Sequence, residues 1–155
     1  MVLLVVAACG GGDDPMTVTL TSGDCTYSGP ESVAAGPVSI AVVNETGNLA
    51  VFDFHRINAT HTYADLASHI DEEQASIDAG TDTVGPPPYT TIIDAVLFLP
   101  TDEDRSAAEA DGLTVFLVGE EGSLDTTLTA GIYAVVCVAP DAGSIRIAGP
   151  FEATE

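Results

Sequence analysis

The sequence predicts an all-β fold, an antiparallel β-sandwich. Eight or so short segments rich in Val, Ile, Thr, Phe and Tyr alternate with clusters of Gly, Pro, Asn and Asp, which is the pattern of strands joined by turns. The most strand-like segment is residues 128–137, LTAGIYAVVC, because β-branched and aromatic residues fill it and a Gly-containing turn precedes its core. We expect it to be a central, largely buried strand. A length of 155 residues suits one domain.

The first third of the chain is expected to supply the first strands. Alternating or β-branched segments bounded by turn residues predict strands at residues 16–20, from 25 through 33, at 38–43 and at 49–57. In the last of these, side chains alternate between the two faces, so Asp53 and His55 share the outward face.

Residues 58–112 change character and are expected to form a partly helical insertion. Thr62 followed by Asp65 is a helix-capping pattern. The short apolar stripe behind it consists of Leu66, Ala67 and Ile70. Residues 71–89 are acidic and end in a Gly-Pro-Pro-Pro run, so we expect a long surface excursion there. A strand is expected at residues 92–99.

The remaining strands follow the insertion. Residues 113–118 and 123–128 flank a Gly-Glu-Glu-Gly sequence and are expected to pair as a hairpin. After the central strand, a turn at residues 140–143 leads into a last strand at 145–151.

The charge balance excludes one class of partner. The chain has 24 acidic residues against three arginines and no lysine, a formal charge of −21. Such a surface repels phosphate backbones, so we expect no nucleic acid partner. The acidity fits either an ordinary solvating surface or a saline habitat in which counterions screen the repulsion.

The N-terminus resembles a bacterial lipoprotein signal. Residues 1–8 are apolar, and Val-Ala-Ala before Cys9 resembles a lipobox, in which cleavage precedes a cysteine that then carries lipid. The basic region that usually begins such a signal is missing and the apolar run is short, which a start codon assigned too far downstream would explain. Residues 9–15 would be a flexible tether. The alternative is a frayed apolar terminus with an incidental cysteine.

Several residues together resemble the cupredoxin family. Gly131 and Tyr133 stand shortly before Cys137, as in the penultimate cupredoxin strand, and a turn and one final strand close the chain. A strand ending at Asn44 is followed by a loop and another strand. The resemblance implies a cupredoxin-like Greek-key antiparallel β-sandwich over residues 16–154, interrupted by the insertion at about 58–112. By analogy with other sandwiches, Tyr133 would be a corner tyrosine, and Asn44 would serve its turn.

The family's copper ligands are mostly absent. Cupredoxins hold copper with a His in the loop after the Asn, the Cys, a His three residues later and a Met beyond it. In this chain those positions fall at about Ala50, at Cys137, at Pro140 and at about Ile145. Because a type 1 copper site needs two imidazoles beside the thiolate, we expect no copper cofactor.

The cysteines that remain suggest a covalent link. If Cys9 is lipidated, Cys25 and Cys137 form an even pair in a compartment that oxidises thiols, and we predict a disulfide between them. Two separately buried thiols are the alternative. The lipobox, CTYSGP, the Asn-x-Thr after a strand and GIYAVVC are together similar to uncharacterised bacterial lipoproteins with copperless cupredoxin-like domains.

One other constellation can bind metal. Asp53 and His55 share a strand face and His61 follows a few residues later, which gives a possible copper or zinc site. Isolated surface histidines are the alternative. No phosphate-binding loop or nucleophile elbow is present, so we expect no enzyme activity.

The sequence therefore predicts a cell-envelope lipoprotein, held by its lipid on the outer side of the cytoplasmic membrane or in the periplasm. We expect it to be a non-catalytic binding or scaffolding module for an unknown protein or envelope component. Its specificity is expected in the insertion at residues 58–112, since loops on rigid sandwiches commonly carry it. The alternative is a copper- or zinc-handling envelope protein that uses His55, His61 and nearby carboxylates.

Overall fold

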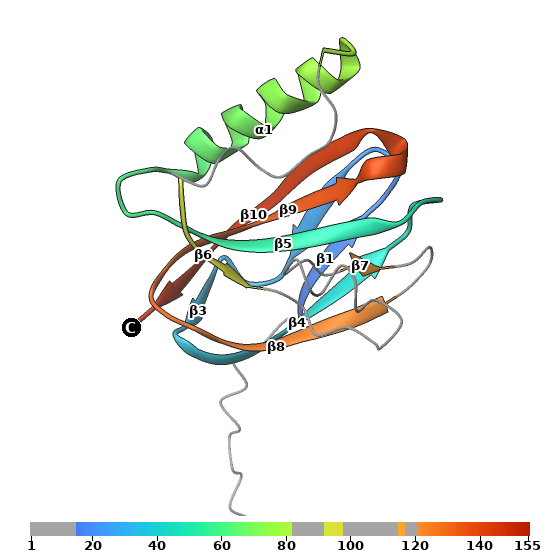
Figure 1. Ribbon diagram of the computed structural model, residues 1–155. Coiled ribbons are helices and arrows are strands. Elements are labelled where there is room, and N and C mark those ends of the chain that lie inside the picture. Colours follow the sequence, from blue (N-terminus) through green and yellow to red (C-terminus); the bar gives the residue numbers. More distant parts are fainter. Residues whose placement is uncertain (1–14, 82–91, 98–114, 117–120) are drawn as a thin grey trace, which may run out of the picture.

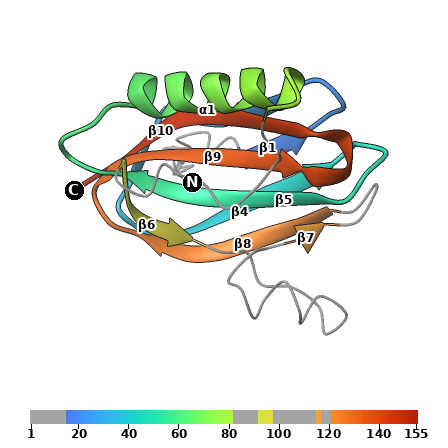
Figure 2. The same cartoon turned by 45° about the horizontal axis from the view of Figure 1, so that its top comes forward.

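The computed structural model describes residues 15–81, 92–97, 115–116 and 121–155, and it confirms a β-sandwich with a helix inserted after the fifth strand. Two sheets pack face to face, and the helix α1 lies outside them (Figures 1 and 2). The four-stranded sheet has the order β2-β1-β4-β8; the six-stranded sheet has the order β3-β10-β9-β5-β6, with β7 also paired to β5.

The strand bounds follow the predicted segments closely. The four-stranded sheet contains β1 (Met16–Leu20), β2 (Cys25–Ser28), β4 (Gly36–Asn44) and β8 (Glu121–Leu128). The six-stranded sheet contains β3 (Ser32–Ala34), β5 (Ala50–Ile57), β6 (Ile93–Leu97), β7 (Val115–Phe116), β9 (Gly131–Ala139) and β10 (Ser144–Thr154). A short 3-10 turn, η2 (Pro140–Ala142), joins β9 to β10.

The sheets are mixed rather than purely antiparallel, which corrects the expectation from sequence. β1 runs parallel to β4, and β3 runs parallel to β10. The chain passes from the four-stranded sheet to the six-stranded sheet between β2 and β3 and then returns. Because of that crossing, β4 comes back on the far side of β1 in the same direction as β1.

The hairpin expected around residues 119–122 is wrong. β7 pairs with β5 in one sheet, whereas β8 pairs with β4 in the other. Glu121 and Gly122, expected in the turn, belong to β8 and lie opposite Val43 and Val42. The long β4 offers eight register pairs to β8, so tertiary pairing overrides the local turn signal.

The sandwich core lies between the two sheets. Alternate residues of each strand point into it, and its largest fully buried side chains include three phenylalanines, which are Phe52, Phe54 and Phe151. β9 is buried on both faces: Val135 and Cys137 face the sandwich core, while Ala134 and Val136 face a second cluster. This confirms the prediction of a central buried strand.

The second cluster lies between α1 (Tyr63–Asp78) and the outer face of the six-stranded sheet. Leu66 and Ile70 from the helix are fully buried against Ala134, Val136 and Ile145. Figures 1 and 2 both show α1 running along β10. The helix of the insertion is therefore a structural cover for one face of the sheet.

The helix begins where the capping pattern predicts. The Thr62 hydroxyl accepts a hydrogen bond from the Asp65 amide at 3.2 Å, and the Asp65 carboxylate accepts one from the Thr62 amide at 2.6 Å. Together they form a capping box.

The helix ends at Asp78, well beyond the stripe predicted from sequence, so residues 71–78 are helical and not part of a loop. Gln74 explains the extension. Its Oε1 accepts hydrogen bonds from the Ile145 amide at 2.8 Å and from the Arg146 guanidinium, and its Nε2 donates to the Gly143 carbonyl at 3.2 Å. These bonds tie the acidic half of the helix to the start of β10.

The capping box gives a first prediction. Thr62→Ala should lower the free energy of unfolding by about 1 kcal/mol, because it leaves helix amides without an acceptor. Thr62→Ser keeps the hydroxyl and should retain most of the stability, as measured by urea denaturation. An equal loss in both variants would show that the threonine methyl group, and not the cap, matters.

Candidate functional site

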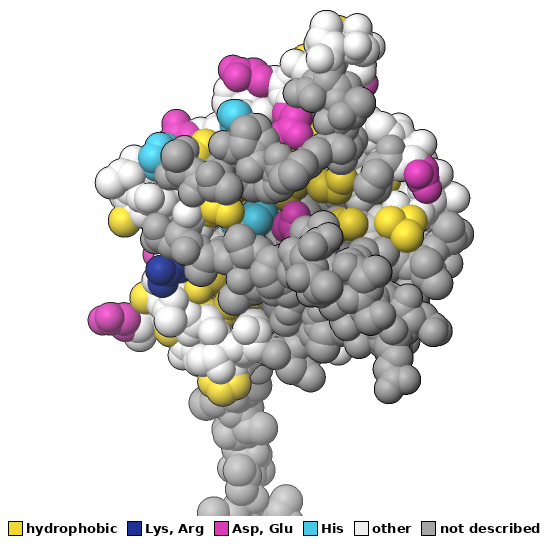
Figure 3. Space-filling model, viewed as in Figure 1, with side chains coloured by type: hydrophobic (Ala, Val, Ile, Leu, Met, Phe, Trp, Pro, Cys, Tyr) yellow, Lys and Arg dark blue, Asp and Glu magenta, His cyan; other side chains and the backbone are white. Residues whose placement is uncertain are grey.

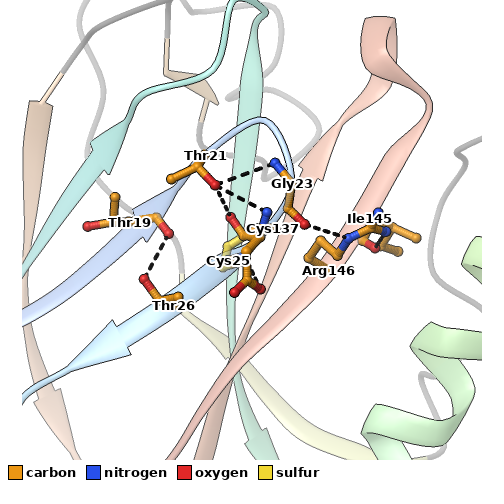
Figure 4. Close-up of a disulfide and its surroundings, with 9 residues drawn as sticks. Thr19, Thr21, Gly23, Cys25, Thr26, Cys137, Ile145 and Arg146 are labelled. Atoms are coloured by element: carbon orange, nitrogen blue, oxygen red, sulfur yellow. Dashed lines mark hydrogen bonds between the residues drawn. A yellow bond between two sulfur atoms is a disulfide. The ribbon is translucent and has the colours of Figure 1, made fainter.

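Cys25 and Cys137 form a disulfide that joins the two sheets, in support of the predicted pairing. Cys25 begins β2 in the four-stranded sheet, and Cys137 lies near the end of β9 in the six-stranded sheet. Both side chains are buried in the sandwich core, and their Cα atoms lie 6.2 Å apart across 112 residues of sequence (Figure 4). The bond therefore crosses the hydrophobic core itself.

The turn before Cys25 holds this cysteine in place. Thr21 Oγ1 accepts hydrogen bonds from the amides of Gly23 at 3.4 Å and Asp24 at 3.2 Å, and Asp24 Oδ1 accepts one from the Cys25 amide at 2.9 Å. Arg146 Nε donates to the Gly23 carbonyl at 3.4 Å, which links the turn to β10 (Figure 4).

The residues at the family's ligand positions do not fit a type 1 copper ion. The sulfur of Cys137 is already bonded to that of Cys25. Ala50 is buried in the sandwich core, and Ile145 lies in the cluster beneath α1. Neither they nor Pro140 carry a side-chain donor atom. A site that needs a thiolate and two imidazoles cannot form from this set.

Asn44 organises the turn that follows β4. Its Oδ1 accepts hydrogen bonds from the Thr46 amide at 3.1 Å and the Thr46 hydroxyl at 2.7 Å, and its Nδ2 donates to the Asn48 carbonyl at 3.0 Å. Asn44 and Thr46 are both buried. An interior network of this kind replaces backbone pairing where the chain leaves the sheet.

Gly131 and Tyr133 shape the entry to β9. The Tyr133 hydroxyl donates to the Thr129 carbonyl at 3.0 Å and accepts from the Thr129 amide at 3.2 Å, which is the geometry of a corner tyrosine. Gly131 has φ +153°, and a Cβ there would lie 2.9 Å from Cδ of Arg56. Glycine suits this position because L side chains rarely adopt this backbone conformation, and because the stem of the Arg56 side chain packs over it.

Asp53 and His55 lie together on the outer face of β5, but both are buried. The sequence predicted an outward face and the structure agrees, yet the side chains are only 4% and 1% exposed. Histidine and acidic side chains are seen next to each other in the middle of the face that carries β5 and α1 (Figure 3). Alternation along a strand does not reveal whether its polar face is exposed or covered.

Burial changes the titration of both groups. Desolvation raises the pKa of Asp53 to about 6 and lowers the pKa of His55 to about 4. Asp53 Oδ1 is buried and has no hydrogen-bond partner in the described part of the chain. His55 is therefore neutral at pH 7, while the Asp53 carboxylate is held in an unfavourable environment.

The structure does not gather the proposed metal ligands into a set of three. His61 lies in the loop after β5, where its Nδ1 is 3.1 Å from the Thr60 hydroxyl and its amide donates to the Asn58 carbonyl at 2.9 Å. Within residues 15–81, 92–97, 115–116 and 121–155, no group of three or more His, Cys, Asp or Glu side chains could hold a metal ion. The Asp53 and His55 pair remains as a candidate with two donors.

Comparison with known proteins adds structural neighbours only. No family model and no curated protein matches the sequence. A reduced auracyanin from the photosynthetic bacterium Roseiflexus castenholzii has a TM-score of 0.43 and 16% identity, covering 90% of this chain and 95% of that one. Auracyanin A, a blue copper protein from Chloroflexus aurantiacus, has a TM-score of 0.43 and 15% identity, covering 91% and 100%. A multicopper oxidase has a TM-score of 0.40 and 12% identity, covering 92% and 44%.

Other predicted features lie outside the residues that the structure describes. Cys9 and the tether at residues 9–15 lie almost wholly outside the described residues, as do large parts of the insertion (82–91 and 98–112). Among the helices that the structure describes, none is long and apolar enough to cross a bilayer.

The disulfide gives a second prediction. Adding reductant should lower the free energy of unfolding by up to about 4–5 kcal/mol, because the bond closes a loop of about a hundred residues in the unfolded chain. Urea denaturation with and without reductant measures the loss. The double variant Cys25→Ser/Cys137→Ser should already be destabilised and should not respond further. If reductant does not change the free energy of unfolding of the wild-type protein, the disulfide does not stabilise the fold.

Asp53 gives a third prediction. A carboxyl whose pKa is higher in the folded state stabilises the fold while it is protonated, and that stability is lost as the pH rises through about 6. The stability of wild type relative to Asp53→Asn should therefore fall by about 3 kcal/mol between about pH 4 and pH 7, since each pKa unit corresponds to about 1.4 kcal/mol. His55 has the opposite dependence, because its pKa is lowered, but it is present in both proteins.

Denaturation of both proteins across this pH range measures the difference. Asp141→Asn removes an exposed carboxyl in the turn after β9 and serves as the matched charge control. If the difference in free energy of unfolding between wild type and Asp53→Asn does not change with pH, the Asp53 carboxylate is not buried in its charged form.

Proposed function

We propose that this chain is a cell-envelope lipoprotein whose cupredoxin-like sandwich is a non-catalytic binding or scaffolding module. Cys9 carries the lipid, residues 9–15 form the tether, and the sandwich is presented on the outer side of the cytoplasmic membrane or in the periplasm. Its partner is a protein or another envelope component.

The observation that carries the proposal is the Cys25–Cys137 disulfide. Cys137 is the one residue that matches a cupredoxin copper ligand, and its sulfur is used to join the sheets. A disulfide in the core supports an oxidising compartment outside the cytoplasm, which is where a lipid-anchored envelope protein resides. The ligands that a cupredoxin uses to hold its redox-active copper are not available in this chain. The rigid sandwich, which can present surfaces and loops to a partner, is retained.

The competing function is metal handling, and one observation favours it. Asp53 Oδ1 is buried without a hydrogen-bond partner in the described part of the chain, beside the neutral imidazole of His55. Carboxylate and imidazole are ligands that zinc and copper accept. The described residues offer only this pair, which is too few for a closed site.

The experiment that separates the two functions is a metal titration of the Cys9→Ser protein with its disulfide intact. We expect no binding of Cu²⁺ or Zn²⁺ at micromolar concentration and neutral pH by calorimetry, because no free thiol remains and the described residues bring only two donors together. Binding that disappears in His55→Gln but persists in His69→Gln would replace the proposal with metal handling. The anchor is tested separately: protein extracted from native membranes should begin at Cys9 and carry acyl chains by mass spectrometry.

A further inference from the structure

A groove opens at the end of the sandwich away from the disulfide. It lies where β2 passes into β3, beside the start of β9 and the second half of β10, and its volume is about 670 Å³. Ile132, the second residue of β9, lines it, whereas Cys137 stands near the other end of the same strand. The lining residues are Tyr27, Gly29, Glu31, Ser32, Ile132, Gly149, Pro150, Phe151 and Glu152.

The groove has a rigid aromatic side. The Tyr27 ring stacks on Phe151 with ring centres 5.1 Å apart, and Phe151 stacks in turn on Tyr133 at 5.4 Å. The Tyr27 hydroxyl donates to the Pro30 carbonyl at 2.8 Å, which fixes its orientation. Gly29 approaches so closely that a Cβ would lie 2.8 Å from that hydroxyl. The surface is therefore held in shape before any ligand arrives, which lowers the entropic cost of binding.

An exposed apolar side chain lines the same groove from the outer face of the sheet. Ile132 is 39% exposed and is the exposed large hydrophobic residue within the described part of the chain. Pro150 beside it is also exposed. In a protein this acidic, a groove lined by an uncovered isoleucine and a half-buried tyrosine is a surface suited to apolar groups.

Acidic side chains flank the apolar surface. Glu152 lies in register with Ile132 on one side and with Ser32 on the other, and Glu31 precedes Ser32. Both glutamates are exposed, and none of the described lining residues is a lysine or arginine. Adjacent strands are about 4.8 Å apart, so a carboxylate lies within reach of any ligand that covers Ile132.

We propose that this groove binds an extended cationic peptide segment of a partner protein, with apolar side chains against Ile132 and against Tyr27 and basic side chains at Glu31 and Glu152. The assignment rests on the proposed role as a binding module and names the partner chemistry. Charge complementarity selects this occupant. A second copy of a chain with charge −21 would be repelled, and so would the chain's own tether, which contains Asp13 and Asp14.

The test uses the full chain carrying Cys9→Ser and a fluorescent hexapeptide of alternating lysine and leucine, with fluorescence anisotropy at low ionic strength. Ile132→Ser should weaken binding about three- to tenfold through lost apolar contact. Glu31→Gln/Glu152→Gln should weaken it by a similar factor, since exposed ion pairs contribute modestly. A peptide with serine in place of leucine should bind more weakly than the original.

The matched control is Glu45→Gln/Asp141→Asn, which removes two exposed acids near the disulfide end of the sandwich. It should change the affinity less than about twofold. An equal loss of peptide affinity in this control would show that the peptide is attracted non-specifically to an acidic protein, and it would contradict the proposed binding in the groove. If the protein forms a dimer that the Ile132→Ser substitution dissociates, the surface binds a second copy of the chain, and the peptide-binding proposal is wrong as well. If the peptide does not bind, the proposal for the groove is wrong but the proposed function still stands. If metal binds through His55, the proposed function itself is wrong.

Discussion

The burial of both faces of β9 is the constraint on which the rest of the structure depends. Val135 and Cys137 fill the space between the sheets, while Ala134 and Val136 need a cover on the opposite side. Each fully buried aliphatic side chain contributes roughly 1.5–3 kcal/mol relative to its exposed state. The helix α1 provides that cover, so the insertion that interrupts the sandwich also completes its second hydrophobic layer.

The two ends of the sandwich have different physical characters. Near Cys137 the disulfide, the turn around Thr21 and the Asn44 network all fix the backbone. At the opposite end the β2–β3 crossing leaves an aromatic and acidic groove open.

Local sequence signals succeeded where the determining contacts are close in the chain. The Thr62 and Asp65 pair located the helix start because the capping box is made within three residues. The expected hairpin failed because Glu121 and Gly122 pair with β4, which is distant in sequence. The helix end was missed because Gln74 is bound by residues about seventy positions later, and its acidic neighbours resemble a loop. The parallel pairs arise from a crossing between sheets that no short segment encodes.

The sequence by itself determined which segments are strands, where the helix begins, and which cysteine lies in the central strand. Those properties depend on residue type and on short-range periodicity. Only the tertiary structure decided that Asp53 and His55 are buried with altered pKa values, that Ile132 stays exposed, and that Cys25 meets Cys137. Burial and long-range contact depend on which distant element covers a face, and covering depends on how sheets and helix pack together.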